Sequence, residues 1–128
     1  MSQSKQTILC VDDNKDNLDL ITFVFERTGF EVTACDSLEE CLSHVRRKNF
    51  QAIILDNHFA ERTSLEVCQE IRFLNKLIPI LFYSGEARPV EIARALAAGG
   101  NAYLVKPNDF ERLTETVIKL IRETPAGI

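Results

Sequence analysis

The chain has 128 residues, 45% of them hydrophobic and 27% charged, which is typical of one globular domain with a single core. Its net charge of −4 argues against direct nucleic-acid binding, which requires a basic face. It shows neither a signal peptide nor an apolar stretch of roughly 18 residues, so we expect a cytoplasmic protein that makes no membrane contact.

Two apolar patterns alternate along the chain. The runs rich in β-branched and large apolar residues, which predict strands, are Thr7–Val11, Glu31–Cys35, Ala52–Leu55, Ile78–Tyr83 and Ala102–Val105. Helical spacing of apolar residues follows each run, at residues 15–28, 38–45, 64–75, 88–98 and 110–120. The four cysteines lie among apolar neighbours without C-x-x-C spacing, and we expect buried, reduced thiols.

Capping signals agree with these helix positions. Ser37, with Glu40 three residues later, predicts a capping box at the start of the second helix. Gly29 and the pair Gly99–Gly100 follow the first and fourth helices, where glycine predicts a C′ position. Pro107–Asn108 can open the last helix.

The order of the elements predicts the fold class. Strand-then-helix units in succession indicate an α/β protein with a parallel sheet and helices on both faces, because parallel strands need crossover connections. Five such units favour a flavodoxin-like (βα)5 doubly wound, five-stranded sheet of order 2-1-3-4-5. Ligands of such sheets bind beyond the carboxyl ends of the strands.

Polar residues stand at those carboxyl ends: Asp12–Asp13, Asp56, Ser84 and Lys106–Pro107. Three carboxylates packed together repel unless a cation neutralises them, and Mg²⁺ suits a few carboxylates and water. This set of groups supports phosphoryl transfer to an aspartate, in which the protein mainly positions the group and stabilises its charge.

Each residue also has an ordinary explanation when it is taken alone. Asp12–Asp13 could cap the first helix, and Asp56 could be a turn residue. Lys106 could be a solvated lysine, Ser84–Gly85 a plain turn, and Tyr103 a packing residue. These readings do not explain why the polar residues follow four strands of one sheet, and the joint pattern favours a shared site.

The sequence resembles the response-regulator receiver domain of two-component signal transduction over about residues 6–122. The motifs that carry the resemblance are VDDN, AIILDN, FYSG and YLVKP, in family order. It implies that Asp56 is the phosphoacceptor, that Lys106 and Ser84 assist it, and that Ser84 and Tyr103 form the switch. We expect one receiver domain over residues 1–128 and no output domain in this chain.

The resemblance also implies ligands for Mg²⁺, the expected cofactor. These are Asp13, Asp56 and the backbone carbonyl of His58, with Asp12 acting through water. It further implies a cis peptide bond between Lys106 and Pro107.

The partners implied by the resemblance are proteins. A sensor histidine kinase or a phosphotransfer protein would supply the phosphoryl group. A downstream protein would read the surface formed by the helix at 88–98, the strand Ala102–Val105 and the last helix, and homodimer formation stays open. The chain would assist its own phosphorylation and dephosphorylation without being a turnover enzyme.

The segment after the acceptor departs from the family pattern. Ala60 and Ser64 stand where a proline and a glycine are common, so we expect an altered or more mobile loop. The alternative function is a pseudo-receiver that binds partners without phosphorylation. His58 and Glu86, each two residues beyond a site residue, either tune the lifetime of the phosphorylated state or are solvated loop residues.

Overall fold

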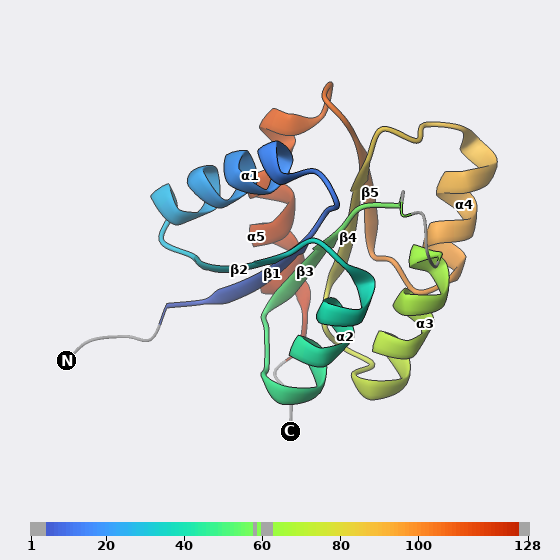
Figure 1. The fold of residues 1–128 in the computed structure, drawn as a ribbon, viewed down its shortest axis with the longest axis horizontal. Coiled ribbons are helices and arrows are strands. Elements are labelled where there is room, and N and C mark those ends of the chain that lie inside the picture. The colour runs from blue at the N-terminus through green and yellow to red at the C-terminus, as the bar shows by residue number, and fades with distance from the viewer. Residues whose placement is uncertain (1–4, 58, 60–62, 126–128) are drawn as a thin grey trace.

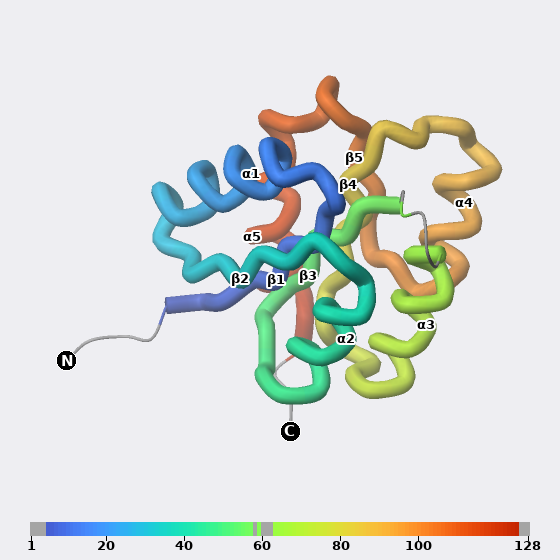
Figure 2. The backbone as a smooth tube through the Cα atoms, in the orientation of Figure 1, coloured from blue at the N-terminus to red at the C-terminus, as the bar shows by residue number. Residues whose placement is uncertain are grey.

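The computed structural model describes residues 5–57, 59 and 63–125, and its chain alternates strands and helices (Figure 1). In chain order the elements are β1 (Thr7–Val11), α1 (Lys15–Arg27), β2 (Glu31–Cys35), α2 (Leu38–Arg47), β3 (Ala52–Leu55), α3 (Ser64–Leu74), β4 (Ile80–Ser84), α4 (Pro89–Ala97), β5 (Ala102–Val105), the 3₁₀ turn η1 (Phe110–Arg112) and α5 (Leu113–Glu123). Figure 2 traces how each helix returns the chain from the carboxyl edge of the sheet toward its amino edge.

The five strands form one parallel sheet of order β2-β1-β3-β4-β5, which confirms the predicted fold class. Helices α2, α3 and α4 cover one face, and α1 and α5 cover the other. The strands β1, β3 and β4 are buried along their whole length, because helices cover both of their sides. Their near-continuous apolar runs are the reason that the sequence predicted them well.

The core has one layer on each face of the sheet. Toward α2 and α3 it contains Leu42, Val67 and Ile71, and toward α1 and α5 it contains Phe25 and Val117. Each of these side chains is at most 1% exposed. Burying an aliphatic or aromatic side chain of this size contributes about 1.5–3 kcal/mol, so these two layers are the main source of stability.

The predicted helix signals are present. Ser37 Oγ accepts a hydrogen bond from the Glu40 amide at 3.2 Å and caps α2. Gly29 and Gly99 follow α1 and α4 with φ values of 94° and 124°, a backbone conformation that favours glycine.

Most boundaries agree with the prediction to within one or two residues, but the starts of β4 and α5 differ for identifiable reasons. Strand β4 begins at Ile80 instead of Ile78, because Pro79 has no N–H for the ladder and the Ile78 amide donates instead to Asn75 Oδ1 at 3.0 Å. Helix α5 begins at Leu113 instead of Pro107–Asn108, because Asp109 Oδ2 accepts the Val105 amide at 2.8 Å and holds a turn there.

All four cysteines are buried and none forms a disulfide. Burial raises the pKa of the Cys68 thiol to about 11, although the charge of Arg72 opposes this shift. Such thiols remain protonated and unreactive at neutral pH. Within the part of the chain that the structure describes, no helix combines the length and apolarity needed to cross a membrane.

Candidate functional site

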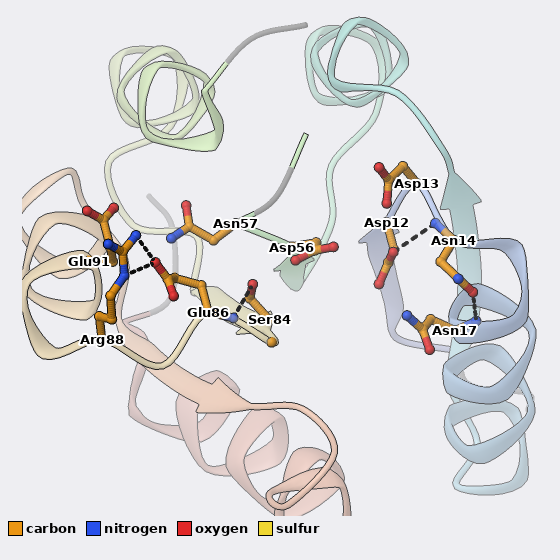
Figure 3. Close-up of a pocket in the computed structure, with 11 residues that line it drawn as sticks. Asp12, Asp13, Asn14, Asn17, Asp56, Asn57, Ser84, Glu86, Arg88 and Glu91 are labelled. Atoms are coloured by element: carbon orange, nitrogen blue, oxygen red, sulfur yellow. Dashed lines mark hydrogen bonds and ion pairs between the residues drawn. The ribbon is translucent and has the colours of Figure 1, made fainter. Parts of the chain in front are cut away.

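An open cleft of about 710 Å³ lies at the carboxyl edge of the sheet (Figure 3). The sheet register creates it: Val11 pairs with Leu55, so the next residues, Asp12 and Asp56, stand side by side. The residues that line the cleft are Asp12, Asp13, Asn14, Asn17, Asp56, Asn57, Ser84, Gly85, Glu86, Arg88 and Glu91.

Three carboxylates meet in this cleft. One oxygen from each of Asp12, Asp13 and Asp56 lies within 4.8 Å of the others. Asp12 and Asp56 are only 2% and 5% exposed, whereas Asp13 is exposed. Hard oxygen donors that converge in this way are suited to a divalent cation, so the donor set fits Mg²⁺.

Lys106 reaches the same carboxylates from the end of β5. Its Nζ lies 2.5 Å from Asp12 Oδ2 and 3.3 Å from Asp56 Oδ2. Burial would lower the pKa of Lys106, but the hydrogen bond to Asp12 and the charges of both aspartates raise it above its usual value. Lys106 therefore stays protonated and neutralises part of the acidic cluster. The Lys106–Pro107 peptide bond is cis.

The surroundings of Asp56 disfavour the charged form of its carboxyl group. Burial raises the pKa of Asp56, the charge of Lys106 opposes that shift, and the charge of Asp12 adds to it, leaving the pKa above its usual value. A side-chain hydrogen bond with Ser84 also stabilises the ionised carboxylate. A cation or an incoming phosphoryl group would relieve the repulsion between the two aspartates.

Hydrogen bonds hold the backbone of Asp56 in place at both its amide and its carbonyl group. Its amide donates to the Val11 carbonyl at 3.0 Å, continuing the ladder between β1 and β3. Its carbonyl accepts the Ser64 hydroxyl at 2.6 Å, from the first residue of α3. Ser64, where the family often has glycine, is 1% exposed and makes this contact through its hydroxyl.

Ser84 and Tyr103 form the other wall of the site. Ser84 is fully buried, and its Oγ accepts the Glu86 amide at 3.2 Å. Tyr103 stacks on Phe82 with ring centroids 5.9 Å apart, and its hydroxyl donates to the Glu86 carbonyl at 2.6 Å. Burial raises the pKa of Tyr103, and the hydrogen bond from Asn57 partly offsets that shift.

The structure therefore brings together Asp12, Asp13, Asp56, Ser84 and Lys106, as the strand-end pattern predicted. Asp12 also has a local role, because its Oδ1 accepts the Asn14 amide at 2.9 Å. The cap of α1 is Asn14, which accepts the Asn17 amide at 3.0 Å. Asn14, and not Asp12 or Asp13, therefore caps α1. His58 and Ala60 lie outside the described residues.

The lining residues that the sequence did not predict include Asn57 and Arg88. Arg88 Nε donates to Glu86 Oε1 at 2.7 Å, so a cation holds the Glu86 carboxylate at the rim of the cleft (Figure 3). Asn57 Nδ2 lies 3.5 Å from the Tyr103 hydroxyl. Asn57 follows Asp56 directly, and that adjacency could have predicted its place in the cleft. Arg88 lies four residues after Ser84, and its contacts depend on the path of the loop, which the sequence does not reveal.

Comparison with known families identifies the class of protein. The sequence-family model of the response regulator receiver domain matches residues 8–118. The chain therefore belongs to the receiver-domain family of two-component systems.

The relatives include regulators and sensor kinases. The transcriptional regulatory protein ZraR of Salmonella typhimurium is 34% identical over 124 residues, which are 97% of this chain and 28% of that protein. The CAI-1 autoinducer sensor kinase/phosphatase CqsS of Vibrio cholerae is 30% identical over 119 residues, 91% of this chain and 17% of that protein. The chain thus spans less than a third of the length of these relatives.

Solved structures show the same architecture. A two-component response regulator from Clostridium difficile superimposes with a TM-score of 0.88 at 25% identity, covering 93% of this chain and 98% of that one. The response regulator TrrA of Thermotoga maritima, solved in complex with Mg²⁺ and BeF, gives a TM-score of 0.81 at 29% identity, covering 90% of this chain and 98% of that one.

Proposed function

We propose that Asp56 accepts a phosphoryl group from a sensor histidine kinase or phosphotransfer protein, with Mg²⁺ as cofactor. The convergence of the carboxylates of Asp12, Asp13 and Asp56 within 4.8 Å, with Lys106 against two of them, carries this proposal. A carboxylate nucleophile requires in-line access and neutralised charge, and the cleft and the ammonium group supply both.

In the proposed reaction an Asp56 carboxylate oxygen attacks phosphorus, and the bond from phosphorus to the donor nitrogen or oxygen breaks. The leaving group keeps the electron pair of that bond. Lys106 and the Ser84 hydroxyl hold phosphoryl oxygens. Mg²⁺ would be held by Asp13, Asp56 and the His58 carbonyl, with Asp12 through water, and would neutralise the charge that develops on the phosphoryl group.

The covalent group resides on the protein's own side chain, and its hydrolysis by water returns the free aspartate. The domain is therefore proposed to be a phosphoacceptor that assists its own phosphorylation and dephosphorylation and not a turnover enzyme. Glu86 and His58 are proposed to tune the rate of that hydrolysis. Unchanged loss of phosphate in the Glu86→Ala and His58→Ala variants would refute this tuning role.

The signal is proposed to leave through the face made by α4, β5 and α5. The Ser84 hydroxyl would move toward the phosphoryl group and open space into which the Tyr103 ring would rotate further inward. Phosphorylation supplies the differential contacts that shift the population, and a downstream protein reads the altered face.

Intact-mass measurement after incubation with acetyl phosphate and Mg²⁺ tests the proposal. We expect the wild type to gain one phosphoryl group, and the Asp56→Asn variant or an EDTA-treated sample to gain none. The Asp19→Asn variant is the matched control, because Asp19 is exposed on α1 and outside the cleft. A wild type that gains no mass and binds no fluoroberyllate would instead support the pseudo-receiver alternative.

A further inference from the structure

The Tyr103 hydroxyl lies between two loops that leave neighbouring strands. On one side it donates its hydrogen to the Glu86 carbonyl, in the loop after β4, at 2.6 Å. On the other side Asn57 Nδ2, in the loop after β3, lies 3.5 Å from the same oxygen. Since the hydroxyl hydrogen is already used, a second partner must be a donor, and the amide NH₂ of Asn57 is one.

The Asn57 side chain projects from a fixed position. It follows Asp56, whose amide and carbonyl are both hydrogen-bonded to the surrounding structure. Asn57 is half-buried and lines the acidic cleft, so this one residue borders the acceptor site and also contacts the Tyr103 hydroxyl on β5.

We infer that Asn57 is a positioning residue that holds the Tyr103 hydroxyl in its half-buried place beside the Glu86 carbonyl, and so couples the Tyr103 ring directly to the loop that follows Asp56. This route from Asp56 to Tyr103 runs beside the one through Ser84. Its effect on phosphoryl binding rests on the proposed function, whereas the Asn57–Tyr103 contact does not.

The size of the effect follows from the type of bond. A neutral hydrogen bond at 3.5 Å is at the weak end, so its removal should shift the balance between the observed position of the Tyr103 ring and more exposed positions by about two- to fivefold. The ring would keep its stacking on Phe82 and its bond to the Glu86 carbonyl. A partial shift is therefore expected instead of a complete loss.

The variant to make is Asn57→Leu, which keeps the approximate shape of the side chain and removes the donor. The chain has two tyrosines. Tyr83, on β4, is 4% exposed and packs on the opposite face of the sheet from Tyr103, so it serves as an internal reference. In protein with ¹³C-labelled tyrosine, a soluble paramagnetic probe should broaden the Tyr103 ring signal more in the variant than in the wild type. The broadening of the Tyr83 ring signal should be the same in the variant and the wild type.

A double-mutant cycle on fluoroberyllate affinity separates coupling through Tyr103 from a direct effect on the cleft. Asn57→Leu should weaken binding about two- to fivefold in the wild-type background and have no effect in a Tyr103→Phe background. An equal loss in both backgrounds would overturn the inference, as would unchanged protection of Tyr103 from the probe. If no variant binds fluoroberyllate, the proposed function fails, and the tyrosine spectra alone still decide the role of Asn57.

Discussion

Helices α3 and α4 pack side by side on one face of the sheet but are held very differently. Thr63 caps α3 by accepting the Glu66 amide at 3.2 Å, and the Ser64 hydroxyl ties the helix to the carbonyl of Asp56. Four residues of α3 are buried: Ser64, Val67, Cys68 and Ile71. The first turn of α3 is thus part of the acceptor site.

Helix α4 has fewer restraints at the end near the site. Its N-cap residue, Arg88, makes no side-chain capping bond within the described structure, and Ala95 is the one buried residue of the helix. Val90 is 53% exposed and Leu96 42%. A helix with few buried contacts opens at a low free-energy cost, so α4 can rearrange while α3 stays in place.

The far end of α4 is anchored by α3 itself. Arg72, in the last turn of α3, donates to the Gly99 carbonyl at 3.0 Å and to Asn101 Oδ1 at 2.6 Å. Asn101 Oδ1 also accepts the Ile80 amide at 2.8 Å, which joins this anchor to the start of β4. Any movement of α4 is therefore expected to be greatest at its amino end, next to Glu86 and the cleft.

The largest contrast between the helices should appear when one apolar side chain of each is truncated. The Ile71 side chain of α3 is fully buried, so Ile71→Ala should lower the free energy of unfolding by about 2–5 kcal/mol. Leu96→Ala, on the exposed side of α4, should change it by less than about 0.5 kcal/mol. Urea denaturation followed by circular dichroism measures both, and equal losses would contradict the comparison.

Gly99→Ala should break the anchor between the two helices. A Cβ at this position would lie 2.6 Å from Arg72 Cγ, and the φ of 124° is strained for any residue with a side chain. We expect a loss of about 1–3 kcal/mol in the same urea titration. Gly85→Ala is the control, because a Cβ there meets no described atom within 4 Å; an equal loss in the control would show that the anchor does not matter.

Much of the fold, and the convergence of the site residues, follows from patterns that the sequence displays. The strand ends that place Asp12, Asp56, Ser84 and Lys106 together were predictable, because burial of the central strands fixes their register. The Ser37 cap and the turns at Gly29 and Gly99 follow from local chemistry, which depends on few neighbours.

Contacts between loops were not predictable in this way. The Asn57–Tyr103 contact joins residues 46 positions apart, and the pair Glu86–Arg88 depends on how the chain turns after β4. Arg72 reaches Gly99 and Asn101 only because α3 and the start of β5 approach each other at the amino edge of the sheet. Hydrophobic periodicity sets which face a residue occupies but leaves the path of a loop unspecified.

Removing the cap of α3 should have a smaller effect than breaking the anchor. Thr63→Ala deletes the oxygen that accepts the Glu66 amide, so the free energy of unfolding should fall by about 1 kcal/mol. Thr63→Ser keeps the hydroxyl and should restore most of that loss. If the alanine and serine variants unfold at the same urea concentration, the cap does not hold the start of α3.

The smallest effect is expected from giving α4 the side-chain N-cap that it lacks. In an Arg88→Ser variant the new hydroxyl can accept an amide of the first turn, whereas Arg88→Ala offers no acceptor. Both variants lose the ion pair with Glu86, which is worth little because Arg88 is 71% exposed, so their difference isolates the cap. The serine variant should be more stable than the alanine variant by about 0.5–1 kcal/mol. Native-state hydrogen exchange should show slower opening of the first turn of α4 in the serine variant. Equal exchange in the two variants would mean that the amino end of α4 is already held by other contacts, and the contrast with α3 would have to rest on burial alone.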